Sequence, residues 1–162
     1  MKTRLSPLRL FPLVLAALCL AVSAADPAPE SGVAKGSFAT KGEKPVALTN
    51  AAAFTDIKDD DKPVILIISD KKIPVEKWTS EFDLIEAKGK LAFTGIVVFI
   101  GKDGAVFRTD MYWKGTQSSV SGVFDVKLDS AVGAKEITGG AMNSDSDPDD
   151  PKLDVMFHAT LK

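Results

Sequence analysis

Residues 142–151, with the sequence MNSDSDPDDP, form a cluster of side chains that could bind a metal ion. Against the template of a calcium-binding loop, its first, third, fifth and seventh positions are Asn143, Asp145, Asp147 and Asp149. The sixth position requires a glycine for a sharp turn, but the chain has Pro148 there, so an EF-hand is excluded. We interpret the stretch as an acidic hairpin loop whose carboxylates, including Asp150, point into water. A weak calcium site of the extracellular type over 143–150 is the alternative.

The other residues that could take part in catalysis do not form a recognisable set. His158 is the only histidine, and strand alternation over 153–161 places it on a polar face, which predicts a solvated side chain. Ser69 and Lys72 match the pattern S-x-x-K, but Ser69 ends a predicted strand, where residues three apart point to opposite faces. The chain also has no nucleophile elbow, P-loop, dinucleotide fingerprint or zinc-binding histidine cluster. The sequence therefore predicts no catalytic residues, no metal site and no cofactor.

The start of the chain has the three parts of a secretory signal peptide. Three basic residues precede an apolar run over 10–22, and small residues follow it. The run is shorter than the roughly 20 residues that a membrane-spanning helix needs. We expect cleavage after Ala24 or Ala25, which assigns 1–25 to the signal peptide, 26–32 to a polar leader and 33–162 to a single β-rich domain. The predicted location is the periplasm or the exterior of the cell.

Removal of the signal peptide changes the charge and the thiol content of the chain. The whole chain has 20 basic and 22 acidic residues, and the loss of three basic residues gives the mature chain a net charge of −5. Such a surface does not attract nucleic acid, and nothing after the signal predicts a membrane span. Cys19, the only cysteine, lies in the apolar run. The mature domain therefore has no thiolate for catalysis or metal binding, and its core must stabilise it without disulfides.

The mature sequence mostly follows the two-residue period of β-strands. The runs 63–69 and 91–100 are continuously apolar, as in strands that are buried on both faces. The GKDG sequence at 101–104 predicts a hairpin between 91–100 and the next strand. Further strands are expected within 33–40, 46–54, 105–113, 118–128, 134–143 and 153–161. Gly95, Gly122, Gly139 and Gly140 fall inside these patterns, where glycine often marks a bulge or a bend.

One segment has helical spacing instead. Val75, Trp78, Phe82 and Ile85 recur at intervals of three and four residues, which predicts an apolar stripe on a helix over about 74–87. Pro74 suits the first turn of this helix, and Gly89 suits its exit. The predicted fold is mainly β, an antiparallel barrel or sandwich of about eight strands with one inserted helix. The alternative is an α+β mixed sheet in which the helix is the crossover of one βαβ unit joining 63–69 and 91–100 in parallel.

The segments GSFATKGEKPVALTNAAAF, VILIISDKKIP and LDVMFHATL resemble those of small exported bacterial β-domain proteins with no assigned activity. This resemblance implies an envelope or secreted β domain and gives no catalytic residue to transfer. Together with the residue analysis, it predicts a secreted or periplasmic, non-enzymatic binding or interaction module. Its expected partner is a small ligand or an envelope or extracellular protein. The alternatives are a hydrolase with an unrecognised site and a weak calcium-dependent module that uses 143–150.

Overall fold

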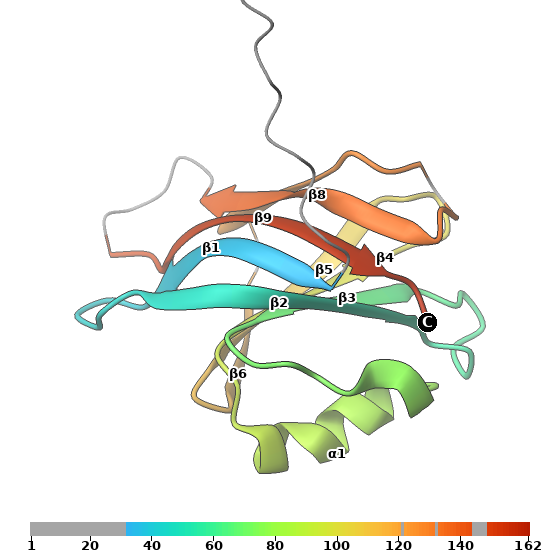
Figure 1. The fold of residues 1–162 in the computed structure, drawn as a ribbon, viewed down its shortest axis with the longest axis horizontal. Coiled ribbons are helices and arrows are strands. Elements are labelled where there is room, and N and C mark those ends of the chain that lie inside the picture. The colour runs from blue at the N-terminus through green and yellow to red at the C-terminus, as the bar shows by residue number, and fades with distance from the viewer. Residues whose placement is uncertain (1–31, 121, 132, 144–148) are drawn as a thin grey trace, which may run out of the picture.

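The computed structural model describes residues 32–120, 122–131, 133–143 and 149–162. Its strands are β1 (Val33–Ala39), β2 (Val46–Thr55), β3 (Val64–Ser69), β4 (Gly95–Ile100), β5 (Val106–Trp113), β6 (Thr116–Val120), β7 (Phe124–Leu128), β8 (Glu136–Asn143) and β9 (Lys152–Thr160). These strands form one antiparallel sheet in the order β6-β5-β4-β3-β2-β1-β9-β8-β7. The sheet curls into a half-barrel, and helix α1 (Glu81–Leu91) lies against one side of it (Figure 1).

The sheet consists of two meanders. Strands β1 to β6 pair in sequence order, β7 to β9 do the same, and β9 then pairs with β1. The prediction of a mainly β, antiparallel fold with one helix is confirmed. The parallel crossover is wrong, because β3 and β4 are antiparallel neighbours. The predicted strand 118–128 is divided into β6 and β7, which become the two edges of the sheet, so there are nine strands rather than eight.

The concave side of the sheet encloses the larger of two apolar clusters. Phe38 of β1 makes edge-to-face contacts with Trp113 of β5, at 5.7 Å between ring centroids, and with Phe124 of β7, at 6.1 Å. Strands from both meanders therefore meet around one completely buried ring. Aromatic pairs of this geometry add to the stabilisation that burial gives, so Phe38 connects the two halves of the sheet.

The second cluster lies between the sheet and the helical segment. Every residue of β4 is buried, and so is every residue of β3 except Val64, because the concave core covers one face of these strands and the helical segment covers the other. The continuously apolar runs predicted this double burial correctly.

Among the described residues, no helix is both long and apolar enough to cross a membrane.

The helical segment differs from the predicted helix over 74–87. It contains a 3₁₀ turn, η1 (Val75–Lys77), an extended Trp78, and then α1, which starts after Ser80. A capping box causes the late start, because Ser80 caps the helix while the Asp83 carboxylate accepts the Ser80 N–H at 2.9 Å. Gly89 is inside α1, and the helix ends before Ala92, which has a left-handed conformation.

The predicted apolar stripe is therefore divided between two elements. Val75 is buried in the second cluster, but Phe82 is 62% exposed and Ile85 is 40% exposed. The helix instead buries Leu84, with Leu91 packed against the same cluster. These two residues are seven apart and share a face that the predicted stripe did not include.

Gly95 at the start of β4 is a position where a neighbouring strand leaves no room for a side chain. A Cβ atom there would lie 1.9 Å from the backbone oxygen of Ile68 on β3. Only glycine allows this approach.

Candidate functional site

An open cavity of about 500 Å³ lies at the end of the half-barrel where the C-terminal end of β9 meets the turn between β2 and β3. Figure 1 shows both segments at that end of the sheet. Its apolar walls come from β3, β4, β7, β8 and the residue after β9, and they are Val64, Ile100, Leu128, Ile137 and Leu161. All five also belong to the concave core or pack against it. The cavity is therefore an extension of the barrel interior that reaches solvent.

The described residues of the loop between β7 and β8 leave this space unfilled. Its described residues at the cavity are small: Ser130, Ala131, Gly133 and Ala134. Hydrogen bonds hold the loop, among them one from the Ala134 N–H to the Ala131 oxygen at 3.1 Å and one from the Thr138 N–H to Ser130 Oγ at 3.3 Å. Half-buried Val64, Leu128 and Leu161 consequently remain partly in contact with water. Apolar surface that stays hydrated beside a core favours an apolar ligand.

The rim of the cavity carries charge. Lys62, Lys102 and Asp103 line it, and Lys102 Nζ lies 3.0 Å from Asp61 Oδ1. Lys62 forms no ion pair with any described residue, so its ammonium group is available to an anion. The arrangement suits a molecule with an apolar body and a negatively charged head.

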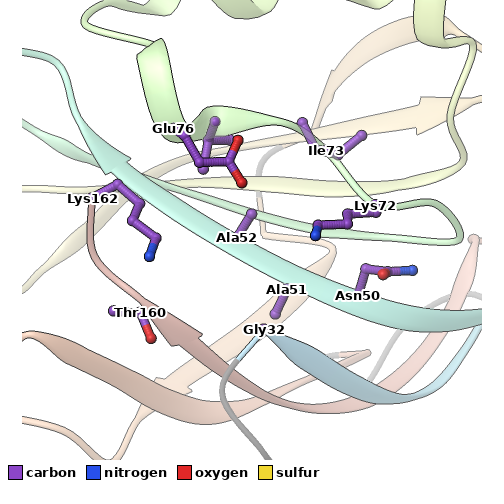
Figure 2. Close-up of a pocket in the computed structure, with 10 residues that line it drawn as sticks. Gly32, Asn50, Ala51, Ala52, Lys72, Ile73, Glu76, Thr160 and Lys162 are labelled. Atoms are coloured by element: carbon purple, nitrogen blue, oxygen red, sulfur yellow. The ribbon is translucent and has the colours of Figure 1, made fainter.

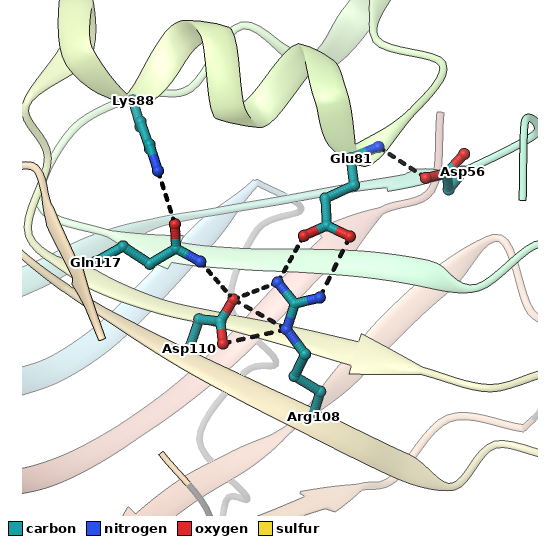
Figure 3. A network of polar contacts seen from close by, with 6 residues as sticks. All are labelled: Asp56, Glu81, Lys88, Arg108, Asp110 and Gln117. Carbon is teal, nitrogen blue, oxygen red and sulfur yellow. Dashed lines mark hydrogen bonds and ion pairs between the residues drawn. The ribbon is translucent and has the colours of Figure 1, made fainter. Parts of the chain in front are cut away.

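A network of charged side chains lies between α1 and β5 (Figure 3). The Arg108 guanidinium donates to both Asp110 and Glu81, and its carbon lies 3.9 Å from the centre of the Phe99 ring. Gln117 donates to Asp110 at 2.9 Å and accepts from Lys88 at 2.9 Å. The network therefore attaches both ends of the helix to the sheet.

Burial and hydrogen bonding have opposite effects on the Asp110 carboxylate, which is fully buried. Burial alone would raise the pKa of Asp110, but hydrogen bonds from Arg108, Ser119 and Gln117 and the charge of Arg108 lower it overall. Burial and the nearby Asp110 charge raise the pKa of Tyr112. Buried groups with shifted pKa values are candidates for catalysis. Here Arg108 and Gln117 already occupy the Asp110 oxygens, so we assign the network a structural role.

His158 lies on the polar face of β9, as alternation predicted, but it is not simply solvated. Its side chain is 18% exposed, and its Nε2 lies 2.9 Å from Glu136 Oε2. Glu136 also accepts the Thr160 hydroxyl at 3.1 Å. The sequence did not indicate this pair because Glu136 belongs to β8, and only the register of β8 with β9 brings the two side chains together.

The S-x-x-K residues do not meet. Ser69 ends β3, as predicted, and its buried hydroxyl donates to the Lys71 oxygen at 2.7 Å, whereas Lys72 is exposed. This separation leaves Ser69 without a base that could activate it in the described part of the chain.

The acidic stretch is described only in part. Asp145 and Asp147 lie outside the described residues, so the proposed loop and the alternative calcium site remain predictions. At its edges, Asp149 pairs with Lys41 at 2.8 Å, and Asn143 Oδ1 accepts the Leu153 N–H at 2.6 Å. Within the described ranges, no three His, Cys, Asp or Glu side chains are grouped as a metal site would require.

Comparison of the chain with protein-family models, with curated proteins and with solved structures finds no match. The function must therefore be argued from the geometry alone.

Proposed function

We propose that the protein is an exported, non-enzymatic binding module that holds a small amphiphilic ligand in the cavity at the open end of the half-barrel. The observation that carries the proposal is the continuity between the core and this cavity, whose apolar walls remain hydrated beside the small residues of the 129–135 loop. Its volume of about 500 Å³ falls within the roughly 300–1,000 Å³ typical of small-molecule sites. The mouth of a β-barrel is also a common position for such a site.

The ligand class follows from the walls and the rim. An alkyl chain placed against Val64, Leu128 and Leu161 would remove their surface from water, at about 25 cal/mol per Å². A carboxylate at the other end of the ligand would lie near Lys62 and Lys102. A medium-chain fatty acid therefore serves as the probe.

Calorimetric titration of the purified protein with decanoate tests this proposal. Ala134→Leu would fill part of the cavity and should weaken binding by at least about tenfold, or 1.4 kcal/mol. Ala47→Leu adds the same side chain at an exposed position on β2 and should leave the affinity unchanged. Lys62→Gln should weaken decanoate binding but leave the affinity for decanol unchanged. Equal affinities of the Ala134→Leu and wild-type proteins, or no binding by either, would contradict the proposal.

A further inference from the structure

A second hollow of about 320 Å³ lies on the outer side of the sheet, beside η1 (Figure 2). Its floor consists of small residues, because Ala51 and Ala52 of β2 lie next to Gly32 there. Ile73 lies on one side, and Thr160 and Lys162 lie on the other, while Val75 also lines the hollow. The small floor residues keep the hollow open close to the backbone of β2.

The hollow arises because β2 changes partners at this point. Its first half pairs with β1 as far as Asn50, and the Ala51 N–H donates to the Gly32 oxygen at 3.2 Å. Further along, the Lys162 N–H donates to the Ala53 oxygen at 3.1 Å, beside a parallel bridge between Ala53 and Leu161. The start of β1 and the segment after β9 thus lie on the two sides of a gap in the ladder.

Three charged side chains border this hollow. In Figure 2 the carboxylate of Glu76 and the ammonium group of Lys72 are directed toward Ala52, and the ammonium group of Lys162 extends toward Thr160. They come from three separate segments, namely the loop after β3, the end of the described chain and η1. None of the three forms an ion pair within the described chain, although opposite charges border the same hollow.

Polar groups on the strands complete the lining. Asn50 donates to Thr49 Oγ1 at 2.9 Å through its amide nitrogen, which leaves its carbonyl oxygen to face the hollow. The Thr160 hydroxyl donates to Glu136, which also contacts His158.

We propose that this hollow is a second binding site, selective for a small zwitterion that carries an ammonium group and a carboxylate. The carboxylate would accept charge-assisted hydrogen bonds from Lys72 and Lys162, and the ammonium group would donate to Glu76. Unpaired opposite charges on facing sides of a small hollow can be bridged by one molecule that has both charges. An apolar ligand is disfavoured, because the charged groups of Lys72, Lys162 and Glu76 would lose their water without gaining a hydrogen-bonding partner.

Nuclear magnetic resonance titration of the labelled protein tests the proposal with four probes: glycine, 4-aminobutyrate, acetate and methylammonium. At least one zwitterion should shift the amide signals of Ala51, Ala52 and Ile73 to saturation. It should bind about tenfold more tightly than acetate or methylammonium, the ratio that one charge-assisted hydrogen bond can give. Lys72→Ala and Lys162→Ala should each weaken this binding. Lys44→Ala, in the turn between β1 and β2, is the matched control and should not.

Glu76→Gln provides the decisive comparison. It should remove the preference for the zwitterion, so that the zwitterion and acetate bind alike. Acetate binding to the wild-type protein as tightly as both zwitterions would overturn the proposal. So would shifts that persist in the two lysine variants, or an absence of saturable shifts with every probe. The cavity-filling variant Ala134→Leu should bind the zwitterion normally, which separates this site from the one at the barrel mouth.

Discussion

The Asp110 carboxylate is fully buried, so its charge depends on the protein for the hydrogen bonds that water would otherwise supply. Arg108 and Gln117 provide them, and Arg108 in turn depends on Asp110 and Glu81. Loss of the Asp110 charge would weaken the hydrogen bonds that this carboxylate accepts, although Arg108 is only partly buried and keeps Glu81 as a partner.

Asp110→Asn should therefore lower the free energy of unfolding by about 1–3 kcal/mol, because the hydrogen bonds from Arg108 lose their charged acceptor while Arg108 stays paired with Glu81 and the shape of the side chain is kept. Urea denaturation followed by circular dichroism measures this loss. Asp125→Asn, the same change at an exposed position on β7, should stay within about 0.5 kcal/mol. Similar losses in both variants would show that the network does not stabilise the fold.

The lowered pKa of Asp110 also predicts how this difference depends on pH. A carboxyl group whose pKa is lower in the folded than in the unfolded state stabilises the fold above the unfolded value, about 3.9. That contribution is lost as the pH falls through this value toward the pKa of the folded state. The stability difference between the wild-type protein and Asp110→Asn should thus be constant near neutral pH and shrink below about pH 4. A difference that grows in acid would contradict the assignment.

Two glycines permit a matched test of close backbone approach. Gly95→Ala should cost about 3 kcal/mol or more, because the new Cβ would lie 1.9 Å from the Ile68 oxygen. Gly89→Ala, inside α1 with nothing within 4 Å of the new atom, should instead stabilise the protein by about 0.5–1 kcal/mol. Thermal unfolding of the two variants measures these opposite effects. A small loss at Gly95 would mean that β3 and β4 separate easily.

At the scale of elements, α1 is attached to the sheet by few apolar contacts and by several polar ones. Leu84 is the buried apolar residue within the helix, while Glu81 and Lys88 reach the network on β5 and β6. Lys71 also donates to the Leu91 and Ala92 oxygens at the end of the helix. The helix thus covers the sheet through polar contacts at its ends and through the apolar side chains of Leu84 and Leu91.

Alanine substitutions on α1 should reflect this arrangement. Leu84→Ala should cost about 2–5 kcal/mol, because it leaves a cavity in the second apolar cluster. Phe82→Ala should change the stability by no more than about 0.5 kcal/mol, although it removes a larger side chain, because Phe82 is 62% exposed. Chemical denaturation distinguishes the two expectations. The reverse order of losses would restore the apolar stripe that the sequence predicted.

The strands could be predicted from the sequence, whereas the helix could be placed only approximately. Strand alternation is a local pattern, and it located most of the sheet, including the hairpin at 101–104. The helix was placed too early because its apolar spacing continues through η1, whereas the Ser80–Asp83 capping box determines where it starts. The cavity and the Glu136–His158 pair could not be predicted, since they depend on strands that are distant in the sequence.

For the whole molecule, export remains the prediction on which the proposed function depends. The protein recovered from the periplasm or the medium should have an intact mass that corresponds to a start at Ala25 or Asp26. The basic, apolar and small-residue order of 1–25 is the reason for this expectation. Mass spectrometry of the exported fraction measures it. Recovery of the uncleaved chain outside the cytoplasm would contradict the signal peptide.

The pairing of β1 with β9 has a consequence for folding kinetics. Strands β2 to β6 can each add to the strand before them, through contacts that are local in the sequence and therefore form early. The other edge of β1 pairs with β9. Because nearly the whole described chain lies between these two strands, this pairing forms late. Until then, β1 presents unpaired backbone groups beside Phe38, and an edge of this kind can recruit strands from other molecules. Aggregation during folding should therefore begin at the exposed edge of β1. It should stop once β9 has paired with that edge.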